Sequence, residues 1–225
     1  MLIDTHAHLD DKQFDKDRDE VIARAFSGGV KKIINIGAGL GSSRRSVELA
    51  EKYENIFASV GLHPHYFNEY KDQSFAKILE LKKLAMRRKV VAIGEIGLDY
   101  FSHNKKIISE KEKELQKSGF IFQLDLAREL NLPVIIHCRG VKSAGADHAS
   151  SDAYDDCYEI IQKYLDLNFV FHCYGGSLEF TEKLLQHKNI YFSFTGNITY
   201  AKPNAEIFKT IKIIPMNKIM LETDC

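Results

Sequence analysis

Residues 32–63, KIINIGAGLGSSRRSVELAEKYENIFASVGLH, contain the pattern that decides the fold. Two apolar runs, KIINIG (32–37) and FASVGLH (57–63), enclose SSRRSVELAEKYE (42–54), whose apolar residues lie about three and four apart. The two runs are continuous rather than alternating, as in parallel strands that are buried on both faces. This stretch therefore predicts a strand, a helix and a second strand in succession.

The same alternation extends along the chain. Stretches of helical period occur at 18–29 and 74–88. Strands are predicted at 2–8, 32–37, 57–63, 90–97, 133–138, 169–173, 190–196 and 218–223. Eight strands that alternate with helices predict an α/β fold, a (β/α)8 TIM barrel formed by residues 1–225 as one domain. A doubly wound open sheet is the alternative, but no G-x-G-x-x-G turn supports it.

Composition narrows the class of protein. The chain is 44% hydrophobic and 28% charged, which is typical of a globular protein, and 31 basic residues balance 31 acidic residues. Net charge therefore neither favours nor excludes an anionic partner. No apolar run approaches the ~20 residues of a membrane helix. The four cysteines form no C-x-x-C pair, so we expect a cytoplasmic protein that does not bind membranes.

Polar residues stand at or just beyond the ends of five predicted strands. They are His6, His8, Glu95, His137, His172 and Asp224. Taken singly, each has a structural explanation, such as a hydrogen-bonded strand end or a helix cap. In a barrel, however, the carboxyl ends of the strands meet at one face. Four imidazoles and two carboxylates gathered there favour two divalent metal ions.

Several motifs resemble the TatD family of metal-dependent deoxyribonucleases and hydrolases, within the amidohydrolase-like superfamily of barrels. They are IDTHAHLD (3–10), GLHPH (61–65), GEIGLDYF (94–101), QKSGFIFQLDLARELNLPVIIHCR (116–139), FHCYGGSLE (171–179), YFSFTGNIT (191–199) and IMLETD (219–224). The resemblance covers nearly the whole chain. It implies a (β/α)8 barrel and a 3′-5′ exodeoxyribonuclease that removes nucleotides stepwise from DNA, single-stranded or at 3′ ends. No obligate protein partner is implied.

The resemblance also assigns roles to the residues of the predicted site. His6, His8 and Asp224 would hold one ion, His137 and His172 the second, and Glu95 would bridge the two. The ions would be Mg, Mn or Zn, and they would activate a water that attacks phosphorus. Asp224 is expected to act as the general base.

Other residues are expected to contact the substrate. The resemblance implies phosphate contacts for His65 and Arg139, and His63 is grouped with them because it shares the GLHPH motif. We hypothesise that Lys105, Lys106 and Lys202 form a track for DNA phosphates. Tyr100 and Phe101 could stack a terminal base, although core packing explains Phe101 equally well.

The sequence departs from the family pattern in two places. GVKSAGADHASSDAYDDC (140–157) is a polar insertion after the HCR motif, and we expect a mobile loop over the site. Relatives continue past the final aspartate with a helix, which this sequence lacks. We therefore expect the first and last strands to lack an outer helix, and Asp224 to fray and weaken metal binding beside His6 and His8.

Two other functions fit the same residues. A paired-metal site can equally hydrolyse a carbonyl compound, such as a cyclic amide or an aminoacyl-tRNA ester. The remaining possibility is a metal-binding barrel without turnover, if the missing helix disables Asp224.

Overall fold

The computed structural model describes residues 1–69, 74–101, 108–140 and 152–225, which contain eight parallel strands. The strands are β1 (Leu2–Ala7), β2 (Val30–Ile36), β3 (Ile56–Val60), β4 (Val90–Asp99), β5 (Val134–Arg139), β6 (Phe169–Phe171), β7 (Ile190–Phe194) and β8 (Ile219–Leu221). Each strand pairs with the next along the chain, in the order β1 to β8. The predicted (β/α)8 barrel is confirmed, and the doubly wound alternative is wrong because the strand order never reverses.

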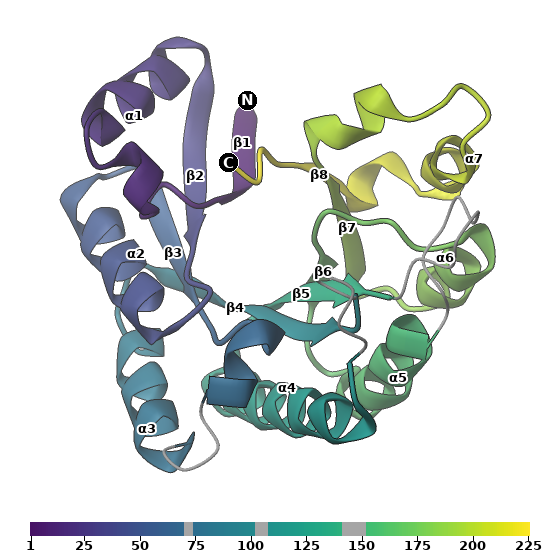
Figure 1. The fold of residues 1–225 in the computed structure, drawn as a ribbon. Helices are drawn as coiled ribbons and strands as arrows, with labels where there is room; N and C mark the ends of the chain where they lie inside the picture. The colour runs from purple at the N-terminus through teal and green to yellow at the C-terminus, as the bar shows by residue number, and fades with distance from the viewer. Residues whose placement is uncertain (70–73, 102–107, 141–151) are drawn as a thin grey trace.

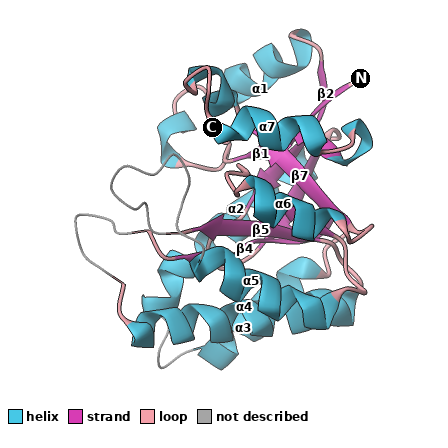
Figure 2. Ribbon diagram, turned by 90° about the vertical axis from the view of Figure 1, so that its right-hand side faces the viewer, coloured by secondary structure: helices cyan, strands magenta, loops and turns pink. Residues whose placement is uncertain are grey.

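Helices connect the strands and form the outer layer of the barrel (Figures 1 and 2). They are α1 (Arg18–Ser27), α2 (Leu40–Lys52), α3 (Ser74–Ala85), α4 (Glu110–Leu130), α5 (Asp152–Ile161), α6 (Leu178–Leu185) and α7 (Glu206–Ile213). Among the described residues, no helix combines the length and apolar character needed to cross a membrane. The expected loop at 140–157 is wrong in part, because α5 already begins at Asp152. Residues 141–151 of that stretch lie outside the described residues.

Helix α4 shows how local sequence sets the boundaries of an element. Ser109 and Glu112 form a capping box, in which each side chain accepts a hydrogen bond from the other residue's backbone N–H. Asn131 ends the helix in the left-handed conformation, with φ of 52°. Between these caps, Gln116 and Gln123 lie seven residues apart, two turns along the same face. Both are buried, and both reach the strand ends described below.

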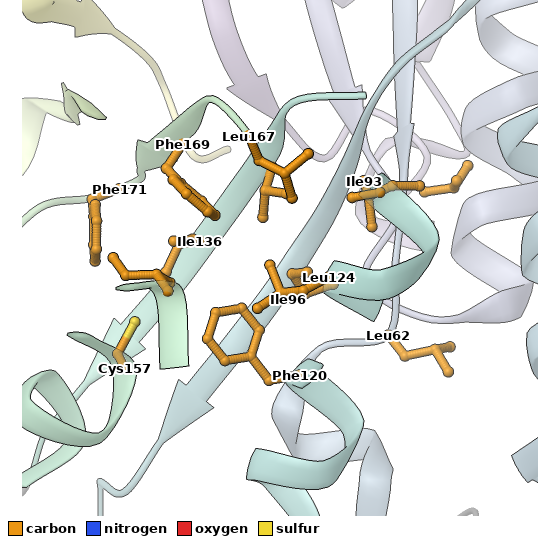
Figure 3. Close-up of a cluster of buried hydrophobic side chains, with 14 of the residues drawn as sticks. Leu62, Ile93, Ile96, Phe120, Leu124, Ile136, Cys157, Leu167, Phe169 and Phe171 are labelled. Carbon is orange, nitrogen blue, oxygen red and sulfur yellow. The ribbon is translucent and has the colours of Figure 1, made fainter. Parts of the chain in front are cut away.

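The main hydrophobic core lies between the outer face of the barrel and the helices. Figure 3 shows Phe120 and Leu124 of α4 directed at Ile96 and Ile136 on β4 and β5. A smaller cluster contains Ile36, Ala92 and Ile135. Ile135 precedes His137 by two residues, so both side chains lie on the same face of β5. The smaller cluster therefore lies inside the barrel, below the predicted site.

The seam between β8 and β1 is bridged by hydrogen bonds from residues that follow β8. The N–H of Asp224 donates to the carbonyl oxygen of His6 at 2.9 Å, and the N–H of His8 donates to that of Cys225 at 3.0 Å. The outer face of the seam is open, since Leu2 is 45% exposed and Leu221 is 54% exposed.

Candidate metal centre

The six predicted ligands converge at one end of the barrel, around the carboxylate of Glu95. Glu95 lies within β4, and it is only 5% exposed. Its two oxygens face different groups of histidines. Oε2 is 3.8 Å from Nε2 of both His6 and His8. Oε1 is 2.7 Å from Nδ1 of His137 and 2.8 Å from Nε2 of His172.

The first group consists of His6, His8 and Asp224. The Nε2 atoms of the two histidines are 3.2 Å apart. Oδ1 of Asp224 lies 3.5 Å from Nε2 of His6 and 3.6 Å from Nε2 of His8. His8 is oriented from behind by the carbonyl oxygen of Ile36, 3.2 Å from its Nδ1. Two nitrogens and one carboxylate oxygen therefore surround a single point.

The second group surrounds Oε1 of Glu95 and contains one histidine more than predicted. Nδ1 of His137 and Nε2 of His172 are 3.2 Å apart. His63 joins them, with its Nε2 3.5 Å from the same carboxylate oxygen. The residue that the sequence grouped with substrate contacts thus lies within reach of the metal ligands. His63, Glu95 and His137 by themselves form a set that could hold an ion.

Burial and mutual proximity shift the pKa values of these groups. Burial alone would raise the pKa of the Glu95 carboxyl, but the histidines, His172 foremost, hold it well below its usual range. Burial and the neighbouring His172 lower the pKa of His6 well below its ordinary value. Burial, reinforced by His137, lowers the pKa of His63 to about 3. His6 and His63 are therefore neutral at pH 7, the form in which imidazole binds a metal.

The chemistry of the cluster fits divalent cations. Imidazole nitrogens and carboxylate oxygens are the ligands that Zn, Mn and related ions share. Nδ1 of His6 and Nδ1 of His172 are buried and have no hydrogen-bond partner among the described residues. Crowded imidazoles that leave buried nitrogens unpaired are costly in a protein interior. A cation bound by the Nε2 atoms of these histidines would offset the cost of crowding them together.

Hydrogen bonds join the segment that carries Asp224 to β1, and the expected fraying of Asp224 stays a prediction. Its backbone N–H bonds to His6 as described, and the preceding Thr223 donates through both N–H and Oγ1 to Asp4, at 3.1 and 2.7 Å. The hydrogen bond to His8 holds the pKa of the Asp224 carboxyl below its ordinary value. The backbone φ of Asp224 is 54°, a left-handed conformation that these contacts maintain.

The structure separates the predicted substrate contacts. His65 is 41% exposed at its side chain, and its Nε2 lies 2.8 Å from Oδ2 of Asp99. Arg139 ends β5, with its guanidinium 3.8 Å from the centre of the Phe101 ring. Lys202 is exposed in the loop before α7. Lys105 and Lys106 lie outside the described residues.

Base stacking by Tyr100 is wrong. The ring is fully buried, and its hydroxyl donates to Oδ2 of Asp156 at 2.8 Å. A side chain enclosed in this way offers no face to a substrate. Phe101 stacks against Arg139 instead, so one of its faces is already covered by the guanidinium.

Two carboxylates that the sequence analysis missed lie directly behind the cluster. Asp99 is 1% exposed, and its Oδ2 is 3.2 Å from Nε2 of His137. Glu222 is 7% exposed, and its Oε1 is 3.7 Å from Nδ1 of His172. A carboxylate that orients a histidine ligand from its far side is common at metal sites. The sequence did contain a signal for both residues. Each is an acidic residue directly after a run of apolar strand residues, and Glu95 stands within such a run.

Buried glutamines of α4 secure the strand ends on this side. Gln116 accepts from the backbone N–H of Asp99 at 2.8 Å and donates to its carbonyl oxygen at 2.9 Å. Gln123 makes the same pair of bonds to Leu62, at 2.7 and 3.1 Å. The helix thereby completes the backbone hydrogen bonding of two segments that carry His63 and Asp99.

A cavity of about 570 Å³ opens beside the second group. Its lining includes the proposed ligands His137, His172 and Asp224, together with Arg139. Residues of the β6–α6 and β7–α7 connections, such as Tyr174 and Asn197, also line it. Its volume suits a small organic ligand or one unit of a polymer.

A parallel barrel with histidines and carboxylates clustered at its strand ends is the arrangement of metal-dependent hydrolases. The particular family follows from a match of residues 3–225 to the model of the TatD related DNases. The chain belongs to this family, and it is a metal-dependent hydrolase with a (β/α)8 barrel.

Individual relatives resemble the chain along almost all of its length. An uncharacterized metal-dependent hydrolase, YabD of Bacillus subtilis, is 37% identical over 229 residues, which cover 100% of this chain and 80% of the relative. The 3′-5′ ssDNA/RNA exonuclease TatD of Escherichia coli is 32% identical over 225 residues, covering 99% and 78%. The crystal structure of YJJV, a TatD homologue from Escherichia coli, superposes with a TM-score of 0.80 at 29% identity, covering 99% and 78%.

Divalent metal is expected to stabilise the fold. An ion that binds the folded state alone at 100 times its dissociation constant adds about 2.7 kcal/mol. For a chain of this size, that corresponds to a rise in Tm of about 5–10 °C. Thermal unfolding with Zn or Mn, measured against a chelated sample, checks this. Ca is the control, because it prefers an all-oxygen shell. Equal shifts with Ca and Zn would argue against an imidazole-rich site.

Proposed function

We propose that the protein is a two-metal phosphodiesterase that removes nucleotides from the 3′ ends of DNA. One observation carries the proposal: the two oxygens of Glu95 face two adjoining groups of histidines, Oε2 toward His6 and His8 and Oε1 toward His137 and His172. A carboxylate in this position can bridge two ions, each completed by its own imidazoles. His6, His8 and Asp224 would hold the first ion, and His137 and His172 the second.

Asp224 is the residue proposed to act as the general base in hydrolysis. Two divalent ions, when bound, activate water near neutral pH and offset charge on phosphate oxygens. The Asp224 carboxylate is 33% exposed at its side chain and lines the cavity. A low-pKa carboxylate at this border is ionised at pH 7 and can accept the proton of the attacking water. It can then return that proton to the leaving oxygen.

Among the residues that the structure describes, Arg139 is the one best placed to hold the scissile phosphate. It lines the cavity next to His137, and its guanidinium is braced against the Phe101 ring. A planar guanidinium binds two phosphate oxygens at once, and stacking restricts its motion. His65, half exposed at the rim, offers a second contact, although its Nε2 is already close to Asp99.

The choice of DNA as substrate rests on relatives rather than on the geometry of the site. The Escherichia coli relative is named as a 3′-5′ exonuclease of ssDNA and RNA. Its resemblance to this chain spans the strand ends that carry all six proposed ligands. The cavity beside the ions is large enough for one nucleotide unit, which fits stepwise release of mononucleotides.

An end-labelled oligonucleotide tests the activity and its direction. With Mg or Mn, single-stranded DNA labelled at its 5′ end is expected to shorten in a ladder, while 3′-labelled DNA releases the label at once as a mononucleotide. A 3′-phosphorothioate end is the matched control and should slow the first step. Cleavage of a cyclic amide or an aminoacyl ester, with DNA left intact, would replace the nuclease by a carbonyl hydrolase. A label pattern of the opposite polarity would overturn the 3′-5′ direction.

A further inference from the structure

Two carboxylates that are not among the proposed ligands lie close to the proposed metal centre, one near each end of the sequence. Asp4 lies two residues before His6, and Glu222 lies two residues before Asp224. Glu222 and Thr223 are successive residues whose side chains bond to different strands. Glu222 accepts hydrogen bonds from Cys173, after β6, and from Ser193 of β7, whereas Thr223 donates to Asp4 of β1. The two carboxylates therefore act on different parts of the cluster.

Asp4 connects the backbones that carry the first group. Its Oδ1 accepts hydrogen bonds from the N–H of His6 at 3.2 Å and the N–H of Thr223 at 3.1 Å. Its Oδ2 accepts from Oγ1 of Thr223 at 2.7 Å. A single carboxylate thus sets the distance between the strand of His6 and His8 and the residue before Asp224. These three ligands come from opposite ends of the chain, and Asp4 joins the segments that carry them.

Glu222 acts on the second group through His172. Its side chain is 1% exposed. It accepts from the N–H of Cys173 and from Oγ of Ser193, each at 2.5 Å. Cys173 has a φ of 43°, so the turn that directs His172 into the site is strained and is held by this bond. Within the described part of the chain, Nδ1 of His172 has no hydrogen-bond partner, and Oε1 of Glu222 lies 3.7 Å from it.

The position of Glu222 favours one tautomer of His172. Nε2 of His172 points at Glu95, on the side of the proposed ion. A ligand nitrogen must present a lone pair, so the proton belongs on Nδ1, where it needs an acceptor. The Glu222 carboxylate lies on that side, with its Oε1 3.7 Å from Nδ1.

We propose that Asp4 and Glu222 are positioning residues for different ions. Asp4 aligns His6, His8 and Asp224 for the first ion, and Glu222 orients His172 for the second. This assignment rests on the two-ion centre proposed above. It goes further by assigning Asp4 to the first ion and Glu222 to the second, where Asp99 already supports His137.

Titration of the metal-free protein with Mn, followed by calorimetry, tests the assignment. Asp4→Asn is expected to weaken binding of one ion by about 10–100-fold, the usual effect of losing such a support. Glu222→Gln is expected to weaken the other ion to a similar extent. His8→Ala and His137→Ala identify which ion is which. Asp4→Asn should therefore add little to His8→Ala but should weaken the ion that remains in His137→Ala, and Glu222→Gln should do the reverse.

Controls separate positioning from general loss of structure. Asp19→Asn removes a carboxylate that pairs with Lys52 on the outer surface, 2.9 Å from its Nζ, and should leave both ions unchanged. If Glu222→Gln does not fold, Ser193→Ala removes one donor to the same carboxylate and should weaken the second ion selectively. Variants that weaken both ions equally, or neither, overturn the assignment while leaving the two-ion centre intact. A wild-type protein that binds one ion overturns both proposals.

Discussion

Replacing Glu95 with glutamine is expected to abolish hydrolysis and to weaken the binding of both ions. The glutamine keeps the shape of the side chain but removes the charge that the two histidine groups share. Metal affinity should fall by more than about 100-fold, because this loss exceeds the effect of removing an outer support. The rate of DNA cleavage should fall by about 1,000-fold or more, as expected when transition-state charge loses its compensation.

The metal-free protein should also lose stability in this variant. Burial opposes the charge of Glu95, but the surrounding histidines, His172 foremost, outweigh it and hold the pKa of its carboxyl well below the usual range. Removing one partner of a buried charged network typically costs about 3–5 kcal/mol. Urea unfolding of the chelated protein measures this term, and calorimetry measures metal binding. Glu114→Gln, on the exposed face of α4, is the control with the same chemical change. A Glu95→Gln protein that still binds two ions tightly would contradict the bridging role.

Gly97→Ala is expected to be the most destabilising change of a single small residue on β4. Gly97 has a φ of 139°, and a Cβ at this position would lie 2.1 Å from the carbonyl oxygen of His137. Left-handed strain and overpacking each cost about 1–3 kcal/mol, so we expect a loss of about 2–6 kcal/mol in unfolding free energy. Because the clash is with the backbone of a proposed ligand, metal affinity should fall as well.

Gly29 offers a matched control for backbone strain alone. Its φ is 104°, but an added Cβ would meet no atom within 4 Å. Gly29→Ala should therefore lose about 1–3 kcal/mol from strain and leave metal binding unchanged. Denaturant midpoints at constant m compare the two variants. Equal losses of stability, or unchanged metal affinity in Gly97→Ala, would show that the contact with His137 is not decisive.

Most of the fold could be predicted because its signals are local. Continuous runs of Val, Ile and Phe mark strands buried on both faces, and all eight runs form strands. The strand ends were less accurate, for reasons that lie elsewhere in the chain. β4 continues to Asp99, where Gln116 of α4 supplies the backbone hydrogen bonds. β6 stops at Phe171, and Cys173 soon turns into the left-handed conformation.

The proposed metal ligands could be predicted from the sequence, but the surroundings of these ligands could not. Residues at strand ends must meet in a barrel, and the six proposed ligands do lie together. The place of His63 beside Glu95 could not be read from the GLHPH motif, because it depends on how the loop after β3 folds back. Tyr100 illustrates the opposite error. An aromatic residue beside a site motif suggested a stacking surface, whereas its ring completes the core and its hydroxyl reaches Asp156.

The sequence by itself determined the order and kind of the elements and the residue types at their carboxyl ends. Both depend on the spacing of side chains along a short stretch of chain. The tertiary structure alone decided which histidines face which oxygen of Glu95, and that Asp4 holds Thr223 across the seam. Those relations join residues that are separated by most of the chain. They exist only after eight strands have curved around to bring β8 beside β1, and that closure cannot be read from any local pattern.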